Sequence, residues 1–415
     1  MHTASASSQP VWTLGVNYWP RRKAMYWWKR FDAGEVRDEL AQIASWGLSL
    51  VRICLLWEDF QPAPDRIDGA ALTNLATVLD VAQAAGLQVM PTLIVGNMSG
   101  VFWFPRWAYS EHSAPRQALW LADTQPTDHL LRDLYGDPEM LRAHTRLAEA
   151  VAEHLGSHPA LWGWDLANEI DATGYPTSDD AGWLWVRTLA AALRFRDAAH
   201  PITYGAHTPS LSDTNHLRID DMATSLDILS MHGYPIYSDV AAAPLDPEFV
   251  PFATVLTAAL GGKPAMMQEF GLCTAAPGEP SHTIQDDFLG QPQPQFLASE
   301  EDAAAYYDAV LGRLRALRVP GALAWCYADY TADLWDRPPL DRAIRERSFG
   351  LVRADGSEKP AIAVLRRHAM APAPGPVAVP DVLNGLTPAA YYADPKRHFA
   401  ELYAHWRAAR SANVE

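Results

Sequence analysis

The stretch LWGWDLANE, residues 161–169, decides the fold, because a short apolar and aromatic run ends there on the polar pair Asn168-Glu169. A second run, PAMMQEFG at 264–271, has the same character and carries Glu269. Runs that are apolar throughout are typical of strands buried on both faces of a parallel sheet. Each strand therefore brings one carboxyl group to its C-terminal end, which is where the active sites of (β/α)8 barrels lie.

Short apolar runs alternate with amphipathic stretches along the chain, as in a parallel sheet whose strands are joined by helices. Eight runs resemble buried strands, which favours a closed (β/α)8 barrel over an open sheet. The predicted strands span 14–18, 49–56, 88–94, 161–167, 202–207, 227–232, 264–269 and 321–327. Helices are predicted at 35–46, 70–85, 139–155, 181–199 and 300–318.

The sequence predicts one barrel domain over residues 1–370, which ends with a helix near 360–369. Residues 371–380 are rich in proline and predict a stiff linker. Residues 381–415 then form a short C-terminal helical extension. Its stretch 394–410 carries an apolar stripe at helical spacing that we expect to pack on the barrel, and a surface for a partner protein is the alternative.

Three connections are too long for plain loops between strands and helices: 19–34, 95–138 and 271–299. All three follow the C-terminal end of a predicted strand, so they should wall the same face of the barrel as the carboxyl groups. Long connections in compact domains tend to be functional.

The net charge limits the kinds of molecule that the protein is expected to bind. The sequence has 33 Lys and Arg against 49 Asp and Glu, a formal net charge of −16. Such a chain is a poor partner for nucleic acid or for an anionic membrane surface. Its 16 Trp residues suit a large core, and they also suit a carbohydrate pocket, since sugar rings stack on indole faces.

The sequence lacks the patterns that mark disulfide frameworks, metal sites, phosphate-binding loops and serine hydrolases. Cys54, Cys273 and Cys326 form neither a disulfide framework nor a metal-ligand cluster. There is no Gly-rich phosphate loop and no G-x-S-x-G elbow. We therefore expect no metal and no cofactor. The N-terminus shows no signal-peptide pattern and no run has the length of a membrane span, so a cytoplasmic protein is expected, with a trimmed secreted chain as the alternative.

Two carboxyl groups that face each other across the mouth of a barrel are the catalytic groups that cleavage of a glycosidic bond requires. A single Glu at a strand end is usually a solvated charge, but Glu169 and Glu269 each end an apolar run. Asn168 and Glu169 are neighbours, so they would point to opposite faces of a regular strand. Both can reach the mouth only if the strand bends there, and we predict such a bend.

The polar and aromatic residues near the strand ends form one set: Arg52, Asn168, Glu169, His232, Tyr234, Glu269 and Trp325. This set resembles glycoside hydrolase clan A, and within it family 5, over residues 12 to about 368. The stretches GVNYWPRRKAMYWW, LLWEDFQP and FGLVRADGSEKP are similar to β-mannosidase-like and mannanase-like members of that family.

The resemblance implies that Glu169 is the general acid/base and Glu269 the nucleophile of a retaining mechanism, with carboxyl groups about 5–5.5 Å apart. Glu169 must hold a proton, so its surroundings are expected to raise its pKa. Glu269 must stay ionised, and Arg52 and Tyr234 are the expected donors to it. A buried arginine needs an anionic partner in any case.

Further pocket residues follow from the resemblance. Asn168 is expected to contact the sugar 2-hydroxyl, and Trp325 to lie beneath the sugar, followed by the cis peptide bond that the family often has there. His232 and Tyr234 share strand parity and can both face the mouth. The histidine that family members often carry near the end of strand three is missing, and Asn97 is its candidate substitute. Weaker candidates are Asn17, Trp19, Trp57, Glu58, His207, Asp329 and Trp335.

Three functions remain open at this stage. The first is a retaining β-mannosidase that acts on β-mannosides or manno-oligosaccharides from a pocket closed at one end. The second is another family 5 β-glycosidase or an endo-glycanase, because the configuration at C2 depends on a few hydroxyl contacts. The third is a non-catalytic sugar-binding barrel, which would need no proton donor opposite a nucleophile. The sequence also leaves open whether the chain forms a homo-oligomer.

Overall fold

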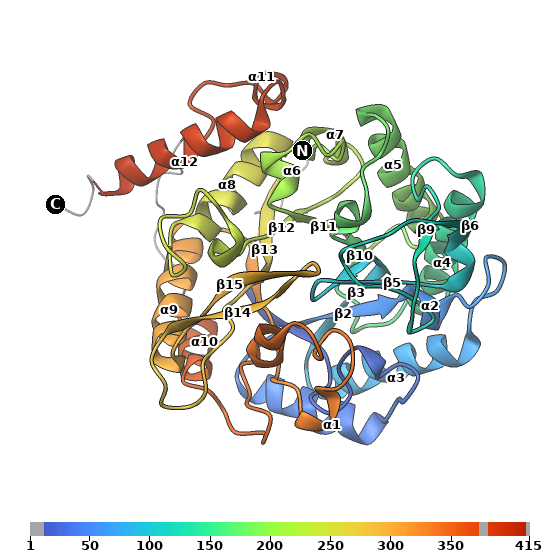
Figure 1. Ribbon diagram of the computed structural model, residues 1–415, viewed down its shortest axis with the longest axis horizontal. Helices are drawn as coiled ribbons and strands as arrows, with labels where there is room; N and C mark the ends of the chain where they lie inside the picture. The colour runs from blue at the N-terminus through green and yellow to red at the C-terminus, as the bar shows by residue number, and fades with distance from the viewer. Residues whose placement is uncertain (1–11, 373–380, 412–415) are drawn as a thin grey trace, which may run out of the picture.

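The structure, a computed structural model, describes residues 12–372 and 381–411. Eight parallel strands close into a barrel in the order β1-β16-β13-β12-β11-β10-β3-β2 (Figure 1). They are β1 (Thr13–Tyr18), β2 (Leu50–Leu56), β3 (Gln88–Val95), β10 (Trp164–Asn168), β11 (Ile202–His207), β12 (Leu229–His232), β13 (Ala265–Phe270) and β16 (Gly321–Ala324). Each corresponds to a predicted strand, so the predicted (β/α)8 barrel is confirmed.

Helices surround the barrel: α1 (Ala33–Ser45), α3 (Gly69–Ala84), α4 (Pro138–Leu155), α5 (Asp179–Arg196), α8 (Phe249–Gly261), α9 (Glu300–Ala316) and α10 (Ala361–Met370). Capping side chains begin several of them, and those of Asp68 and Ser299 accept a hydrogen bond from a backbone N–H in the first turn. The sequence predicted all of these helices except α8. Every residue from Phe249 to Thr257 is buried, so α8 lacks the polar face by which an amphipathic helix is recognised.

The long connections after β3 and β13 are folded, which the sequence did not predict. Residues 95–138 contain a four-stranded sheet and a separate strand pair, and residues 271–299 contain a hairpin. The elements are β4 (Asn97–Met98), β5 (Val101–Phe104), β7 (Trp120–Ala122) and β8 (Gln125–Pro126), the pair β6 (Tyr109–Ser113) and β9 (His129–Leu131), and the hairpin β14 (His282–Phe288) and β15 (Gln291–Leu297). Short helices are α2 (Trp57–Phe60), α6 (Pro209–Ser212), α7 (Ile219–Met222) and α11 (Pro388–Tyr392).

The tip of the β14–β15 hairpin reaches the 95–138 connection (Figure 1). Leu289 and Gly290 form its turn, both at positive φ (53° and 85°), as tight hairpin turns require. A Cβ atom on Gly290 would lie 1.9 Å from the carbonyl oxygen of Gln117, so the backbones touch there. A leucine in place of the usual asparagine or aspartate hides this turn from sequence reasoning.

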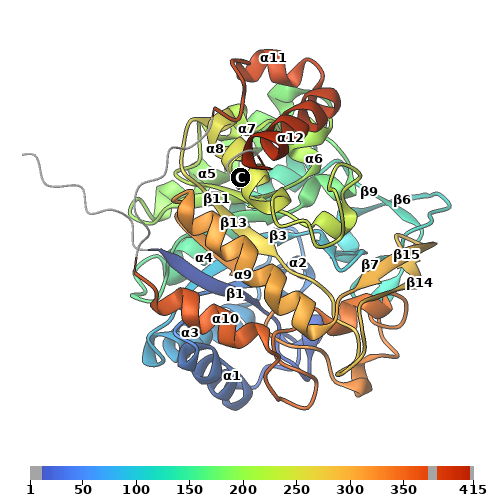
Figure 2. The same ribbon diagram turned by 90° about the vertical axis from the view of Figure 1, so that its left-hand side faces the viewer.

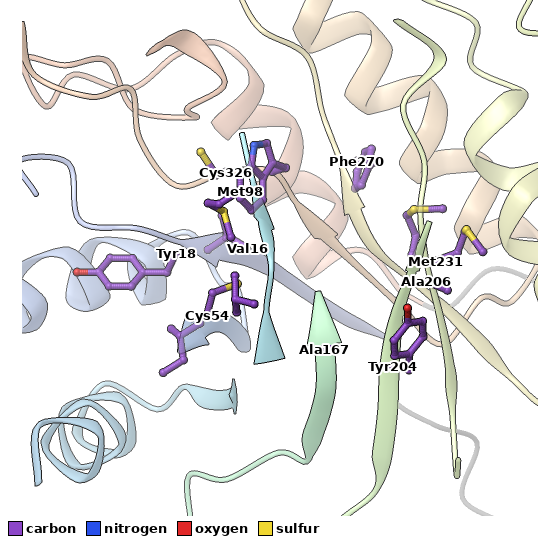
Figure 3. Close-up of a cluster of buried hydrophobic side chains, with 14 of the residues drawn as sticks. Val16, Tyr18, Cys54, Met98, Ala167, Tyr204, Ala206, Met231, Phe270 and Cys326 are labelled. Carbon is purple, nitrogen blue, oxygen red and sulfur yellow. The ribbon is translucent and has the colours of Figure 1, made fainter. Parts of the chain in front are cut away.

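Two apolar regions hold the barrel together. The larger one lies between strands and helices, and Figure 3 shows part of it, with Val16 on β1, Ala206 on β11 and Met231 on β12. The smaller one fills the lumen near the N-terminal ends of the strands. Its four side chains are each at most 1% exposed: Leu50, Met90, Met266 and Leu323. We call this group the lumen floor.

The C-terminal helix α12 (Pro395–Ser411) lies beside α8 (Figures 1 and 2). The ring centroid of Phe252 on α8 is 5.5 Å from that of Phe399, 4.9 Å from that of Tyr403 and 5.9 Å from that of Trp406. Aromatic pairs at these separations attract each other beyond the apolar area that they bury. These contacts fix α12 against the outside of the barrel.

The division into a barrel domain (1–370), a linker (371–380) and an extension (381–415) stays a prediction. Residues 373–380 of the linker lie outside the described part of the chain. Within 12–372 and 381–411, none of the helices is both long enough and apolar enough to cross a membrane.

Candidate active site

Glu169 follows directly on β10, at a sharp turn in the backbone. Its φ of 45° and ψ of 41° lie in the left-handed region, which non-glycine residues seldom adopt. The pairing of β10 with β11 also shifts register between Asp165 and Asn168. The predicted bend is therefore present, and Asn168 and Glu169 both line one cavity.

Glu269 lies near the end of β13 and lines the same cavity. The pairing of β13 shifts register with both neighbouring strands close to this residue. One carboxylate oxygen of Glu169, one of Glu269 and a ring nitrogen of His232 all lie within 4.8 Å of one another. The barrel thus brings together two carboxyl groups from strands far apart in the sequence.

Two side chains donate hydrogen bonds to Glu269. Arg52 Nη1 donates to Oε1 of Glu269, and the Tyr234 hydroxyl donates to Oε2 at 3.0 Å. Burial, together with the charge of Glu269, raises the pKa of Tyr234, so the phenol keeps its proton. Arg52 also donates through Nε to Asp165 at 2.9 Å and through Nη2 to Asn168 at 2.8 Å.

Glu169 has different neighbours, and its pKa moves opposite to the prediction. His232 Nδ1 lies 2.7 Å from Oε1, and Asn97 Nδ2 donates to Oε2 at 3.2 Å. Burial raises the pKa of Glu169, but the charge of His207 and the hydrogen bond with His232 outweigh burial and lower this pKa to about 2. The predicted rise is wrong because two imidazoles and an amide face the carboxyl group.

A proton must nevertheless lie between Glu169 and His232. Nε2 of His232 lies 3.0 Å from Oε1 of Gln268, an amide oxygen that can only accept, so Nε2 carries a proton. A neutral ring then has a lone pair on Nδ1. Its 2.7 Å contact with the carboxyl group therefore needs a proton on one of the two partners. Glu169 and His232 therefore share one proton.

His207, at the end of β11, is held by an aspartate that sequence reasoning missed. Its Nε2 lies 2.8 Å from Asp171, which also accepts from Asn215 at 2.7 Å. Burial lowers the pKa of His207, but the charges of Asp171 and Glu169 outweigh burial and raise it to about 9. His207 Nδ1 is 3.7 Å from Glu169. A lone aspartate in a turn carries no pattern in the sequence that would single it out.

The cavity between the carboxyl groups has a volume of about 390 Å³, within the usual range of small-molecule sites. Trp325 lines it, and the following bond to Cys326 is cis, as predicted. The predicted residues that line the cavity are Asn97, Asn168, Glu169, His207, His232, Tyr234, Glu269 and Trp325. Sequence reasoning missed Tyr237, Phe288, Arg345 and Glu346, which also line it. They come from connecting segments, where no periodicity marks a buried face.

Other predicted residues do not line the cavity. Asn17 lies beneath it and accepts from Arg52 at 2.9 Å. Trp19 and Trp57 are 1% and 0% exposed and belong to the apolar core, because their connections fold back over the barrel. Trp335 is 39% exposed and packs its ring against a guanidinium group. Glu58 and Asp329 form ion pairs, with Lys29 and Lys359 respectively.

The described residues contain one group of three side chains whose spacing would suit a metal ion: Glu169, His232 and Glu269. The Arg52 guanidinium already donates to Glu269, so a fixed positive charge lies at that position. A second cation there would be repelled. The group is therefore a poor metal site.

The sequence matches the family model described as cellulase (glycosyl hydrolase family 5) over residues 5–309. A comparison with curated proteins found no match.

Solved structures share the fold. GH5_18 from Streptomyces cattleya in complex with GlcNAc is 22% identical, with a TM-score of 0.76 over 98% of this chain and 92% of that one. A variant of the same protein in complex with Manβ1-4GlcNAc is 21% identical, with a TM-score of 0.73 over 95% and 92%. The exo-β-1,4-mannosidase Op5Man5 from Opitutaceae bacterium strain TAV5 is 26% identical, with a TM-score of 0.70 over 88% and 62%.

Proposed function

The chain belongs to glycosyl hydrolase family 5, and from this premise we propose that it is a retaining, exo-acting β-mannosidase. The observation that carries the proposal is the approach of Glu169 and Glu269, whose nearest oxygens lie within 4.8 Å. Retaining enzymes need carboxyl groups about 5–5.5 Å apart, whereas inverting enzymes need about 6.5–9.5 Å to admit a water molecule.

The first step is the attack of a Glu269 oxygen on the anomeric carbon. The bond to the leaving oxygen breaks, and that oxygen takes the proton of Glu169. Arg52 and Tyr234 donate to Glu269 and fix its orientation. His232 shares the proton that Glu169 delivers. The products of this step are a glycosyl-enzyme ester and a free aglycone.

The second step reverses these roles. Glu169, now a carboxylate, takes a proton from water as that water attacks the anomeric carbon, and the ester bond to Glu269 breaks. Two inversions restore the original configuration. Asn97, which donates to Glu169 at 3.2 Å, helps to orient the carboxylate for this step.

Exo action is supported by the hairpin. Leu289 at its tip and Gly100 of the 95–138 connection line the same cavity, and Gly290 touches Gln117 beside them. This contact joins the hairpin to the 95–138 connection beside the cavity, which suits a site for a terminal sugar. Mannose is supported by the name of the 26% identical structure and by the Manβ1-4GlcNAc ligand of another. A different β-glycoside, or an internal linkage, is the second candidate.

A panel of nitrophenyl β-glycosides and manno-oligosaccharides tests the sugar and the mode of action. We expect the highest kcat/KM with the β-mannoside, and mannose as the sole early product from oligosaccharides. Proton NMR of the first product should show β-mannose. A preferred glucoside would overturn the choice of sugar, internal cleavage would overturn exo action, and α-mannose as the first product would overturn retention.

Two substitutions separate the roles of the carboxyl groups. Glu269→Ala should lower kcat by roughly 10⁴-fold or more, and azide should restore turnover with formation of the α-glycosyl azide. Glu169→Ala should lower activity on oligosaccharides steeply yet spare substrates with very good leaving groups, because these need no acid. Full activity of both variants on oligosaccharides would contradict the assignment.

A further inference from the structure

Two charged side chains line the cavity but take no part in the proposed chemistry. Arg345 and Glu346 belong to a short helical turn (Ile344–Ser348) beyond β16. They are 2% and 7% exposed. Burying charged groups costs free energy unless they are paired, so their presence in a sugar-sized cavity requires an explanation.

Arg345 has partners on the hairpin and in the turn after β12. Its Nη1 donates to Asp286 at 3.0 Å, and its Nε donates to the Tyr237 hydroxyl at 3.0 Å. Asp286 also accepts from the backbone N–H groups of Ile344 and Arg345, at 2.8 and 2.9 Å. Arg345 is therefore neutralised by Asp286 and ties the hairpin to the turn. It does not need Glu346 for charge balance.

Glu346 is placed differently. Its closest ion-pair contact is Nε of Arg345 at 3.5 Å, which is longer than a hydrogen bond. Burial raises the pKa of Glu346, and the charge of Arg345 opposes that rise. Hydrogen bonds with Ser99 and Tyr237 oppose that rise as well and hold the carboxyl group in place. A buried carboxylate that lines a cavity is the kind of polar group that fixes the orientation of a ligand.

The position of Glu346 relates it to one end of the substrate. Glu169 protonates the leaving oxygen, so the aglycone lies on its side of the cavity, where Ala172 and Thr208 also line the wall. Glu346 belongs to the connection after β16, which is the strand opposite β10 in the order of the barrel, and Tyr237 and the hairpin residue Leu289 line the cavity with it. The part of the terminal sugar farthest from the anomeric carbon is the edge that carries the hydroxyls at C3 and C4.

We propose that Glu346 is a specificity-determining residue that accepts hydrogen bonds from the C3 and C4 hydroxyls of the terminal sugar. The proposal rests on the proposed function, since it assumes that a sugar is bound with its anomeric carbon between Glu169 and Glu269. A glycan extended at C4 lacks that hydroxyl and would place its next sugar against Glu346 and the hairpin. Glu346 would thereby favour a substrate whose terminal sugar has a free C4 hydroxyl, in addition to the effect of the contact between the hairpin and the 95–138 connection.

The test is a double-mutant cycle between the enzyme and the substrate. Wild type and Glu346→Gln are assayed on a nitrophenyl β-mannoside and on its 4-deoxy, 3-deoxy and 2-deoxy analogues. We expect Glu346→Gln to lower kcat/KM on the parent sugar by roughly 10- to 100-fold, as for a hydrogen bond to a charged group. On the 4-deoxy or 3-deoxy analogue the same substitution should cost about 3-fold or less. The 2-deoxy analogue should show no such coupling.

Glu39→Gln is the matched control. Glu39 is also 7% exposed, but it lies outside the cavity, where it accepts from the Tyr18 hydroxyl at 2.8 Å. This variant should keep the wild-type kcat/KM on every analogue. If Glu346→Gln fails to fold in a thermal-unfolding assay, Glu346→Asp keeps the charge and shortens the reach, and the same coupling is expected.

Equal losses on the parent and deoxy sugars, or no loss at all, would overturn the role of Glu346. These outcomes differ from a failure of the proposed function. Mannose and glucose share the configuration at C3 and C4. An enzyme that prefers β-glucosides would therefore refute the choice of sugar, and the same double-mutant cycle would then be carried out with deoxyglucosides. A wild type that cleaves no β-glycoside would overturn the proposed function itself.

Discussion

The lumen floor and the mouth of the barrel are built on the same strands but from opposite kinds of side chain. Leu50 and Met266 of the floor are at most 1% exposed and touch apolar atoms. Two residues further along β2, Arg52 is equally buried and pairs with Asp165 and Glu269. The floor stabilises the barrel by burial and close packing. The mouth buries charges that gain little net stability from pairing but are costly to leave unpaired.

This contrast predicts that changes at the mouth affect chemistry and stability together, whereas changes in the floor affect stability alone. Arg52→Met should produce the largest effect. It leaves Asp165 and Glu269 without their cation, so we expect a loss of about 3–5 kcal/mol in the free energy of unfolding. It should also lower kcat/KM by roughly 10²- to 10³-fold. Urea unfolding and steady-state kinetics measure the two effects. A stable variant with normal kcat/KM would refute the contrast.

Met266→Ala tests the floor. Removing a buried methionine side chain should cost about 2–5 kcal/mol, because the cavity that it leaves cannot collapse fully. At a temperature where the variant is folded, its kcat/KM should lie within about 3-fold of wild type, since none of the four lumen-floor side chains lines the cavity. A kinetic loss as large as that of Arg52→Met would show that the floor and the mouth are not separable.

The pH dependence of stability sharpens the contrast further. His207 has a folded pKa of about 9 against an ordinary value of 6.5, so the folded state binds this proton more tightly. The resulting stabilisation is complete below pH 6.5, declines as pH rises and is gone above pH 9. It amounts to at most about 3 kcal/mol. In His207→Gln the free energy of unfolding should fall less between pH 6 and pH 9.5 than in wild type. Identical slopes would contradict the protonation of His207.

Sequence reasoning succeeded where the physical signal is local. The eight strands are apolar runs buried on both faces, and Glu169 and Glu269 stand at their ends, so pattern alone located the barrel and both carboxyl groups. It failed for α8, which is buried all round from Phe249 to Thr257, and for the β14–β15 hairpin, whose turn begins with Leu289.

Properties that depend on several distant segments also escaped the sequence. The low pKa of Glu169 arises from His207 and His232, which belong to other strands. Arg345 lines the cavity and is held there by Asp286, which belongs to the hairpin. No single stretch of sequence contains that information, because each effect depends on contacts between segments that lie far apart in the sequence.

The central claim is that Glu269 forms a covalent bond to the sugar, while Glu169 donates a proton in the first step and accepts one in the second. The most direct measurement is inactivation by a 2,4-dinitrophenyl 2-deoxy-2-fluoro-β-mannoside, followed by mass spectrometry of the digested protein. We expect one fluoroglycosyl group per chain, on the peptide that contains Glu269, and reactivation on removal of excess reagent. A label on any other residue, or turnover with no covalent adduct, would contradict the account.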